Sequence, residues 1–411
     1  MLSRRTLLRN AAATLIGVSG RNLISSAKPK IAAILTAYYP SSHADVWVTA
    51  LLEGYDNGQP RSPSLEIVSM YTDQVPKNDM SRAIAAKHGF KIFPKISDAL
   101  TLGKDHLAVD GVLLMAEHGN YPVNERGQIL YPRYEFYRQI VDVYRQSGST
   151  APLFCDKHLS YDWSKAKWMY DQSHELHFPL MAGSSLPFTW RQPPLEFDLE
   201  TPIDKAVVAA YGPKEPYGFH SLEALQCMVE RRAGGETGIA AVQCLEGPQV
   251  WKWTDHNAWA KTLLGAALDR VNERKPGTPQ ENTPEPILFL LDYDDGLQGA
   301  VYVLNGYIKD WAFAARIQGR NEIASTKFWS RMVKPWSHAT GLTYQIEQFY
   351  LNRRPNYPVE RSLLTTGALA ALMDSSYEKA RRIETPHLKI AYRTPEESLF
   401  NTGRIPPAAS A

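Results

Sequence analysis

A lysine that follows a predicted buried strand has the clearest capacity for proton transfer in this sequence. Lys157 follows the apolar run 152–155 with one residue between them, and burial at such a position lowers the pKa of an amine toward neutrality. Asp156 would oppose that shift, and a surface ion pair between these two neighbours is the structural alternative. We predict that Lys157 is a general acid/base, with Asp156 and His158 beside it in the catalytic site.

Polar side chains also follow the other predicted strands in the first half of the chain. Because ligands bind outside the carboxyl ends of the strands in an open parallel sheet, these side chains are expected to share one crevice. Histidine and carboxylate side chains also suit zinc, iron or manganese, so a divalent metal held at this rim is an alternative, although the spacing forms no local metal-binding motif. The candidates for cofactor contacts are Thr36, Ser42, His43, Asp73, Glu117 and His118.

His220 is the candidate catalytic partner of Lys157 from the second half of the chain. It stands at the start of the predicted helix 220–232, where closure of two domains over a cleft would bring it opposite Lys157. Three tryptophans either stack on a sugar-like ring or pack in the core. They are Trp190, Trp251 and Trp253.

The elements that position these residues alternate strictly over the first half of the chain. Alternating strands and helices indicate a parallel, doubly wound sheet with helices on both faces, an α/β fold of the Rossmann-like kind. The predicted strands are 30–35, 65–70, 91–93, 110–115, 152–155 and 179–182. The predicted helices are 44–55, 79–88, 96–102, 134–146 and 164–176.

The pattern changes after Pro187, where strands follow one another more directly. Asp294-Asp295-Gly296 between two apolar runs is a hairpin signal. We therefore expect an α+β domain with a mainly antiparallel sheet over 188–385, after a Rossmann-like domain at 28–187 and before a C-terminal tail at 386–411. Its predicted strands are 203–211, 239–246, 287–291, 299–305 and 311–318, and its further helices are 257–272, 341–351 and 359–377.

Length, composition and charge exclude several classes of protein. The chain has 411 residues, 44% hydrophobic and 21% charged, which is typical of a globular protein long enough for two domains. The formal net charge is +2, and residues 1–27 hold four arginines and no acid, so the remainder carries −2. A mildly acidic body without a basic run argues against nucleic-acid binding and against a polybasic membrane patch. No apolar stretch is long enough for a transmembrane helix.

The first 27 residues resemble an export signal. Ser3-Arg4-Arg5 opens a basic segment, a short apolar run follows at 11–18, and small residues precede a cleavage point near Lys28. The paired arginines are typical of the twin-arginine route. We predict an exported, periplasmic mature chain.

The cysteines suggest neither a disulfide framework nor a zinc site. Cys155, Cys227 and Cys244 are odd in number and lack C-x-x-C spacing. Three buried thiols are the favoured interpretation, and a bridge between Cys227 and Cys244 is the alternative.

The order of elements and several short motifs resemble the Gfo/Idh/MocA oxidoreductase family. Asp156-Lys157-His158 is similar to the family's E-K-P, and Gly218 to Glu223 is similar to its G-x-H-x-x-D. The late segments 346–360 and 368–376 are similar to its closing helices. The resemblance implies catalytic roles for Lys157 and His220, NAD or NADP as a tightly held cofactor, and a sugar or polyol substrate. It also allows a homodimer through the C-terminal sheet, as is frequent in that family.

Three departures from the family pattern concern the cofactor and the catalytic residues. The turn Thr36–His43 contains no glycine, whereas the G-x-G-x-x-G fingerprint uses glycines to admit a pyrophosphate. His158 replaces the proline of the lysine motif. Pro216 replaces the acid that usually stands four residues before the catalytic histidine, and Glu215 is the nearest substitute.

These observations leave three functions open. The first is an oxidoreductase acting on a sugar or polyol with a nicotinamide cofactor. The second is a dinucleotide-free lyase, isomerase or glycosidase that uses the His/Glu/Asp rim, with or without a metal. The third is a non-catalytic carbohydrate-binding protein.

Overall fold

The computed structural model describes residues 27–405, and its first sheet consists of six parallel strands in the order β5-β4-β1-β6-β7-β8. This order makes β1 and β6 neighbours at the point where the strand order reverses. The predicted Rossmann-like parallel sheet is therefore confirmed. Its strands are β1 (Lys30–Leu35), β4 (Glu66–Thr72), β5 (Lys91–Ile92), β6 (Gly111–Met115), β7 (Leu153–Asp156) and β8 (Leu180–Gly183).

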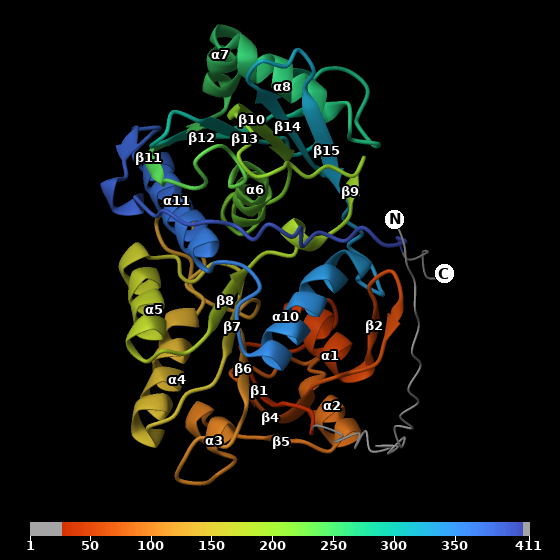
Figure 1. Cartoon of the computed structure of the whole chain (residues 1–411), viewed down its shortest axis with the longest axis vertical. Helices are drawn as coiled ribbons and strands as arrows, with labels where there is room; N and C mark the ends of the chain where they lie inside the picture. Colours follow the sequence, from red (N-terminus) through yellow and green to blue (C-terminus); the bar gives the residue numbers. More distant parts are fainter. Residues whose placement is uncertain (1–26, 406–411) are drawn as a thin grey trace, which may run out of the picture.

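Helices cover both faces of this sheet, because successive residues of a strand point to opposite sides. Ile31, Ala33 and Leu35 of β1 pack on one side, and Ala32 and Ile34 pack on the other. The first side carries the π-helix η1 (Ala44–Val48), α1 (Thr49–Glu53), α2 (Ser81–His88) and α10 (Thr340–Asn352). The second side carries α3 (Ile96–Thr101), α4 (Arg133–Ser147) and α5 (Trp163–Glu175) (Figure 1).

The second sheet has eight strands in the order β16-β11-β12-β13-β10-β14-β15-β9, and only its β10–β13 pair is parallel. The predicted mainly antiparallel sheet is thus confirmed, including the hairpin of β12 and β13 around Gly296. The strands are β9 (Arg191–Gln192), β10 (Ile203–Ala210), β11 (Ile239–Glu246), β12 (Ile287–Tyr293), β13 (Gln298–Val303), β14 (Trp311–Ile317), β15 (Ala324–Phe328) and β16 (Ile383–Glu384).

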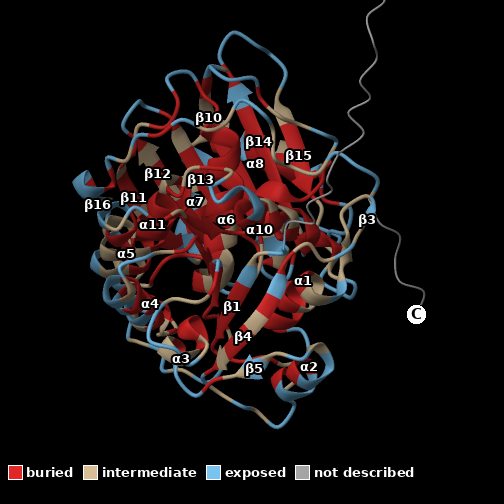
Figure 2. Ribbon diagram, turned by 60° about the horizontal axis from the view of Figure 1, so that its bottom comes forward, coloured by how far each residue is buried: buried red, intermediate tan, exposed pale blue. Residues whose placement is uncertain are grey.

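Helices also enclose the second sheet. On the side toward the first sheet lie α6 (Lys214–Val229) and α11 (Glu360–Tyr377), and on the outer side lie α7 (Pro248–His256) and α8 (Ala258–Leu268) (Figure 1). The central strands of both sheets are accordingly buried (Figure 2). The small hairpin of β2 (Tyr55–Asp56) and β3 (Pro60–Arg61) lies apart from both sheets.

Two sequence-based helix predictions need correction. The helix predicted to begin at His220 begins at Lys214, because Pro216 lies in the first turn, where proline is tolerated. Gly218 lies within the helix and does not end it. A glycine is needed there because the helix packs closely on Phe289, and a Cβ would lie only 2.9 Å from its ring. Helix α7 was not predicted at all, although its tryptophans pack on the outer face of the second sheet.

The last part of the chain returns to the first sheet. Leu342, Ile346 and Phe349 of α10 pack against β1 and β6, although this segment follows the whole second sheet in sequence. The domain boundaries stay a prediction, and so does the export signal, which lies outside the described residues except for its last position.

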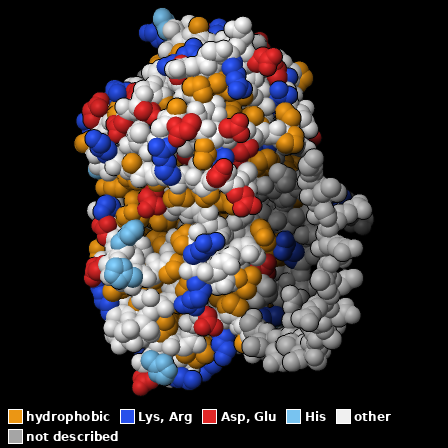
Figure 3. Space-filling model, viewed as in Figure 1, with side chains coloured by type: hydrophobic (Ala, Val, Ile, Leu, Met, Phe, Trp, Pro, Cys, Tyr) orange, Lys and Arg blue, Asp and Glu red, His pale blue; other side chains and the backbone are white. Residues whose placement is uncertain are grey.

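The remaining sequence predictions concern cysteines, membrane helices and charge. Cys155, Cys227 and Cys244 are free and buried, so the alternative Cys227–Cys244 bridge is not formed. Within residues 27–405, no helix combines the length and apolar character needed to cross a bilayer. On the face shown in Figure 3, basic and acidic side chains are interspersed without a large patch of either sign.

Candidate active site

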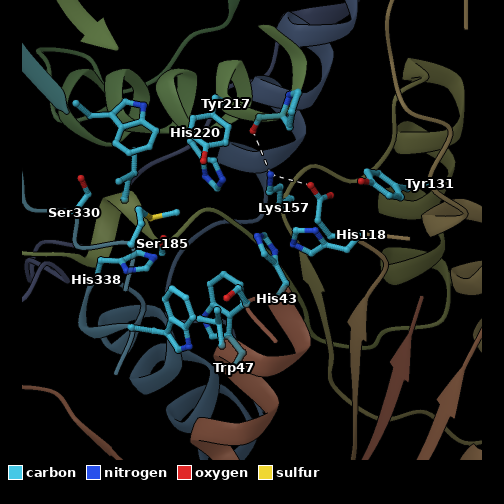
Figure 4. A pocket seen from close by; sticks show the side chains of 18 of the residues that line it. His43, Trp47, His118, Tyr131, Lys157, Ser185, Tyr217, His220, Ser330 and His338 are labelled. Atoms are coloured by element: carbon cyan, nitrogen blue, oxygen red, sulfur yellow. Dashed lines mark hydrogen bonds and ion pairs between the residues drawn. The ribbon is translucent and has the colours of Figure 1, made fainter. Parts of the chain in front are cut away.

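A cavity of about 280 Å³ lies at the carboxyl ends of the first sheet and reaches to α6 and the segment 330–338. The segments that follow β1, β6 and β7 contribute imidazole and charged side chains to its lining, and the second half of the chain contributes an opposite, mainly aromatic wall (Figure 4). The imidazole and charged residues are His43, Glu117, His118 and Lys157; the opposite wall includes Tyr217, His220, Trp311, Trp336 and His338.

Lys157 is held in this cavity by a carboxylate from a neighbouring strand. Its Nζ lies 2.9 Å from Oε1 of Glu117 and donates to the carbonyl oxygen of Pro216 at 3.2 Å (Figure 4). The side chain is buried, and its backbone has a left-handed φ of 65°. Such strain at a non-glycine residue costs on the order of 1–3 kcal/mol and is typical of functional sites. The alternative interpretation, a surface ion pair between Lys157 and Asp156, is not observed, because Lys157 pairs with Glu117 and Asp156 with His43.

Glu117 stands between two cations. It forms ion pairs with Lys157 and with Arg133, the first residue of α4. Burial disfavours the carboxylate, but these two cations outweigh burial and hold the pKa of Glu117 well below its usual range. Glu117 therefore stays ionised and positions the Lys157 ammonium group through a charge-assisted hydrogen bond.

Asp156 acts on the cavity through another residue. Its Oδ2 lies 2.6 Å from Nδ1 of His43, and Asp156 itself is fully buried behind the cavity wall. The ring of His43 packs edge-on against Trp47 and His118, with ring centroids 4.6 and 4.8 Å away. Asp156 consequently orients a cavity histidine instead of pairing with its neighbour Lys157.

Two further histidines in the cavity are neutral. Burial lowers the pKa of His118 to about 3, and its buried Nε2 has no partner within the described residues. Burial, together with Lys157, lowers the pKa of His220 well below its usual range. His220 Nδ1 lies 2.6 Å from Oγ of Ser184. Both imidazoles can therefore hydrogen-bond to an uncharged polar ligand.

His158 does not reach the cavity, contrary to its predicted place beside Lys157. Its Nε2 lies 3.0 Å from Oε1 of Glu215 and 3.3 Å from Arg133. Successive residues point in different directions at the end of a strand, which directs His158 behind the Glu117–Lys157 pair. Glu215 is likewise the partner of His158 and not of His220, so it does not replace the missing family acid.

Three predicted cofactor residues are engaged by the protein itself. Thr36 donates to the carbonyl oxygen of Glu117 at 2.7 Å. Ser42 Oγ accepts hydrogen bonds from the backbone N–H groups of Tyr39 and Asp45. Asp73 accepts from the hydroxyls of Tyr71 and Tyr121, at 2.9 and 2.7 Å. None of the three lines the cavity.

The tryptophans that line the cavity are the part of the site that the sequence prediction missed. Trp47 could have been found, because it follows His43 by four residues and so shares its helix face. Nothing in the sequence around Trp311 and Trp336 indicates that they line the cavity. The tryptophans that were considered lie elsewhere: Trp190 is buried and donates to the carbonyl oxygen of Gly403, and Trp251 and Trp253 pack on the outer face of the second sheet.

The residues around β1 do not fit a dinucleotide in the usual position across β1 and β6. The fingerprint glycines would fall at 36, 38 and 41, which are Thr36, Tyr38 and Ser41. Tyr38 is fully buried and hydrogen-bonded to Thr49. The buried carboxylate of Asp45 accepts from the backbone N–H of Ser41 at 2.9 Å, at the helix start where a pyrophosphate would bind.

The crevice itself is bridged from loop to loop. Gln74, after β4, exchanges two hydrogen bonds with the backbone of Asn120, after β6. The Tyr121 hydroxyl donates a hydrogen bond to Asp73 across the same gap. The rings of Tyr39 and His118 pack edge-on, with their centroids 5.8 Å apart. The space for the adenosine and pyrophosphate parts of a dinucleotide is thus occupied by side chains of the protein. The metal alternative gains no support either, since no cluster of three or more potential ligands occurs among residues 27–405.

Several solved structures share this fold. GenD2 from gentamicin A biosynthesis, in complex with NAD, superimposes with a TM-score of 0.54 at 13% identity, covering 87% of this chain and 96% of that chain. The apo scyllo-inositol dehydrogenase from Lactobacillus casei superimposes with a TM-score of 0.52 at 12% identity, covering 87% of this chain and 98% of that chain. An oxidoreductase from Agrobacterium radiobacter in complex with NAD+, L-tartaric acid and magnesium has a TM-score of 0.51 at 12% identity, covering 87% of this chain and 98% of that chain.

The chain therefore shares its fold with these solved structures, which include an inositol dehydrogenase and an oxidoreductase. No family model and no curated protein matches its sequence. At such low identity the likeness concerns the fold, and the chemistry must be argued from the site.

The buried histidines predict a loss of stability in mild acid. The pKa is about 3 for His118 and about 4 for His338, in both cases chiefly through burial, against 6.5 for an ordinary histidine. Between these values the unfolded chain binds more protons than the folded chain, so stability falls as the pH drops below about 6.5. Each histidine contributes up to about 1.4 kcal/mol per pH unit.

Urea unfolding followed by circular dichroism between about pH 7 and about pH 5 tests this prediction. The His338→Gln variant is expected to show a shallower loss than the parent chain. A free energy of unfolding that stays constant or rises over this range would contradict it.

Proposed function

We propose that this chain is an enzyme that acts on a small sugar or polyol by acid–base chemistry, with Lys157 as the proton-transferring group. The observation that carries this proposal is the Glu117–Lys157 pair at 2.9 Å, buried at the wall of a cavity that is also lined by four histidines from separate segments. Burying the charges of a lysine and a carboxylate costs about as much free energy as their attraction returns, so stability alone does not explain this pair.

The cavity lining supports a hydroxylated ring as the ligand. Trp311 stacks on Tyr217 with a ring separation of 5.5 Å and an interplanar angle of 25°, which forms a flat apolar wall. Buried polar atoms without partners in the described residues line the rest, among them Trp47 Nε1, His118 Nε2 and Ser330 Oγ. A volume of about 280 Å³ lies near the lower end of small-molecule pockets and suits a compound of single-ring size.

The chemistry follows from the charges around the ligand. The Lys157 ammonium group can donate a proton to a carbonyl or hydroxyl oxygen and later recover it, while Glu117 keeps it oriented. His220 is neutral and offers a hydrogen bond to a second oxygen. Such an arrangement catalyses proton transfer in hydroxylated carbonyl compounds, as lyases, isomerases or hydrolases do.

A second candidate function is oxidation or reduction of a sugar or polyol with NAD or NADP. The observation that favours it is the fold likeness to dehydrogenases, one of them in complex with NAD, together with the motif positions of Lys157 and His220. It requires the bridged crevice between the β4 and β6 loops to open.

We expect the purified protein to contain no dinucleotide, because Gln74, Asn120, Tyr121 and Asp73 close the crevice. Native mass spectrometry of protein purified without added cofactor should give the mass of the polypeptide alone. Titration with NADH, followed by nicotinamide fluorescence, should show no saturable binding up to about 1 mM. A mass excess equal to a dinucleotide would instead favour the second candidate.

The proposed function is tested by incubating the protein with a panel of aldoses, ketoses, polyols and sugar acids, without added cofactor, and following them by proton NMR. We expect conversion of at least one member. Saturable binding without conversion of any member would contradict it and would identify a carbohydrate-binding protein.

A further inference from the structure

A histidine–carboxylate pair lies beside Lys157, and its histidine belongs to neither of the motifs discussed above. His43 Nδ1 and Asp156 Oδ2 are 2.6 Å apart, although 113 residues separate them in sequence. Asp156 is 1% exposed and His43 is 15% exposed, so the carboxylate is hidden while the ring reaches the cavity. A buried carboxylate on Nδ1 holds the proton on that nitrogen and leaves Nε2 as the basic atom.

His43 lies close to Lys157 in the cavity, where its Nε2 can contact a bound ligand. His43 lies below Lys157 in Figure 4, with His118 at its side, and all three line the same cavity. Trp47 packs on the other side of the His43 ring and fixes its orientation. The cavity thus contains a proton donor, Lys157, and a proton acceptor of different chemistry, His43, on the same wall.

The pair also stands where the fold would otherwise receive a dinucleotide. His43 is the N-cap of η1 and the last residue of the turn that lacks the fingerprint glycines. The contact with Asp156 ties this helix start to the end of β7 and helps to close the crevice. A basic group therefore stands at the helix start where a pyrophosphate would otherwise bind.

We propose that His43, oriented by Asp156, is the general base that removes a proton from the carbon next to the carbonyl group of an α-hydroxy carbonyl sugar. This inference rests on the proposed function and narrows it to an aldose–ketose type of isomerisation. Asp156 is a positioning residue, because it acts through His43.

Each step of this reaction balances within the site. His43 Nε2 takes the proton from C2, the electron pair forms the C1–C2 double bond, and Lys157 donates a proton to the C1 oxygen to give an enediol. Lys157 then takes the proton of the C2 hydroxyl as the C2 carbonyl forms, and protonated His43 returns its proton to C1. Both residues end as they began, and no oxidant, reductant or further reactant is required.

Deuterium incorporation tests this role. In D₂O the wild-type protein is expected to introduce deuterium next to the carbonyl group of a converted sugar, detected by NMR. The His43→Asn variant should reduce the rate by about 10²–10⁴-fold. The control is His106→Asn, which removes a histidine with the same type of contact, 2.7 Å from Asp105, but on the surface; it should leave the rate unchanged.

The outcomes separate the two proposals. If the wild-type protein converts no member of the sugar panel, the proposed function fails and the base role fails with it. If the wild type converts a sugar and His43→Asn retains its rate, or conversion proceeds without deuterium uptake, only the role of His43 is overturned.

A second measurement does not depend on turnover. Nitrogen-15 NMR of the wild-type protein should show the proton of His43 on Nδ1, and Asp156→Asn should change this signal while circular dichroism confirms a folded chain. A proton found on Nε2 in the wild-type protein would overturn the inference, because that nitrogen could then not act as the base.

Discussion

Replacement of Lys157 by methionine is expected to reduce turnover of the sugar substrate by about 10²–10⁴-fold while the chain remains folded. Methionine fills most of the volume of the lysine stem but cannot transfer a proton. Glu117 keeps its ion pair with Arg133 in this variant, so the buried carboxylate is not left without a cation. The loss of a hydrogen bond to the carbonyl oxygen of Pro216 should lower stability by only about 1–3 kcal/mol.

Initial rates from proton NMR and thermal unfolding by circular dichroism measure the two effects of Lys157→Met separately. Lys167→Met is the matched control, because Lys167 pairs with Asp171 on the exposed face of α5. It should preserve both the rate and the stability. Wild-type turnover in a folded Lys157→Met variant would refute the assignment of Lys157 as the acid/base.

Replacement of Arg133 by methionine is expected to cause the largest loss of stability, about 3–5 kcal/mol in the free energy of unfolding. Arg133 is 1% exposed and pairs with Glu117. It also lies 3.3 Å from His158, which in turn contacts the buried Glu215. Removal of this guanidinium leaves two buried carboxylates with one fewer neighbouring cation, and buried unpaired charge is costly.

Urea unfolding measures the stability of Arg133→Met against a control on the same helix. Arg145 in the last turn of α4 pairs with Glu175, and both side chains are solvent-exposed. Because surface ion pairs contribute about 0–1 kcal/mol, Arg145→Met should change the free energy of unfolding by no more than this amount. Equal losses in the two variants would show that the buried charge network does not stabilise the fold.

The two predictions address different roles of one network. Lys157 faces the cavity and is argued to carry the chemistry, whereas Arg133 lies behind Glu117 and supports it. Rate and stability are therefore expected to separate, with the larger effect on rate at Lys157 and the larger effect on stability at Arg133.

The fold could be predicted because its signals are local. Buried strands such as Lys30–Leu35 and Gly111–Met115 are short apolar runs, and the helices between them have apolar residues at helical spacing. The boundary of α6 was placed too late, since Pro216 and Gly218 act as helix breakers in isolation. Only the position of Pro216 in the first turn and the packing of Gly218 on Phe289 show that both residues are compatible with the helix.

Part of the candidate site could be predicted from one rule, that ligands meet the carboxyl ends of parallel strands. That rule selected His43, Glu117, His118 and Lys157, and the structure places all four on one cavity. The rule selects residues by their place at a strand end and says nothing of where their side chains point. Thr36, Ser42 and Asp73 were therefore selected as well. Their side chains are engaged by neighbouring loops instead.

The sequence by itself determined the order of strands and helices, the class of fold and the edge of the sheet at which polar residues gather. These depend on periodicity and on strand ends, which are properties of short segments. The tertiary structure alone decided that Lys157 pairs with Glu117 and not with its neighbour Asp156, that Asp156 orients His43, and that side chains bridge the dinucleotide crevice. The physical reason is that a charged or polar side chain takes the partner that folding brings within about 3 Å, and in this chain those partners come from strands and loops far apart in sequence.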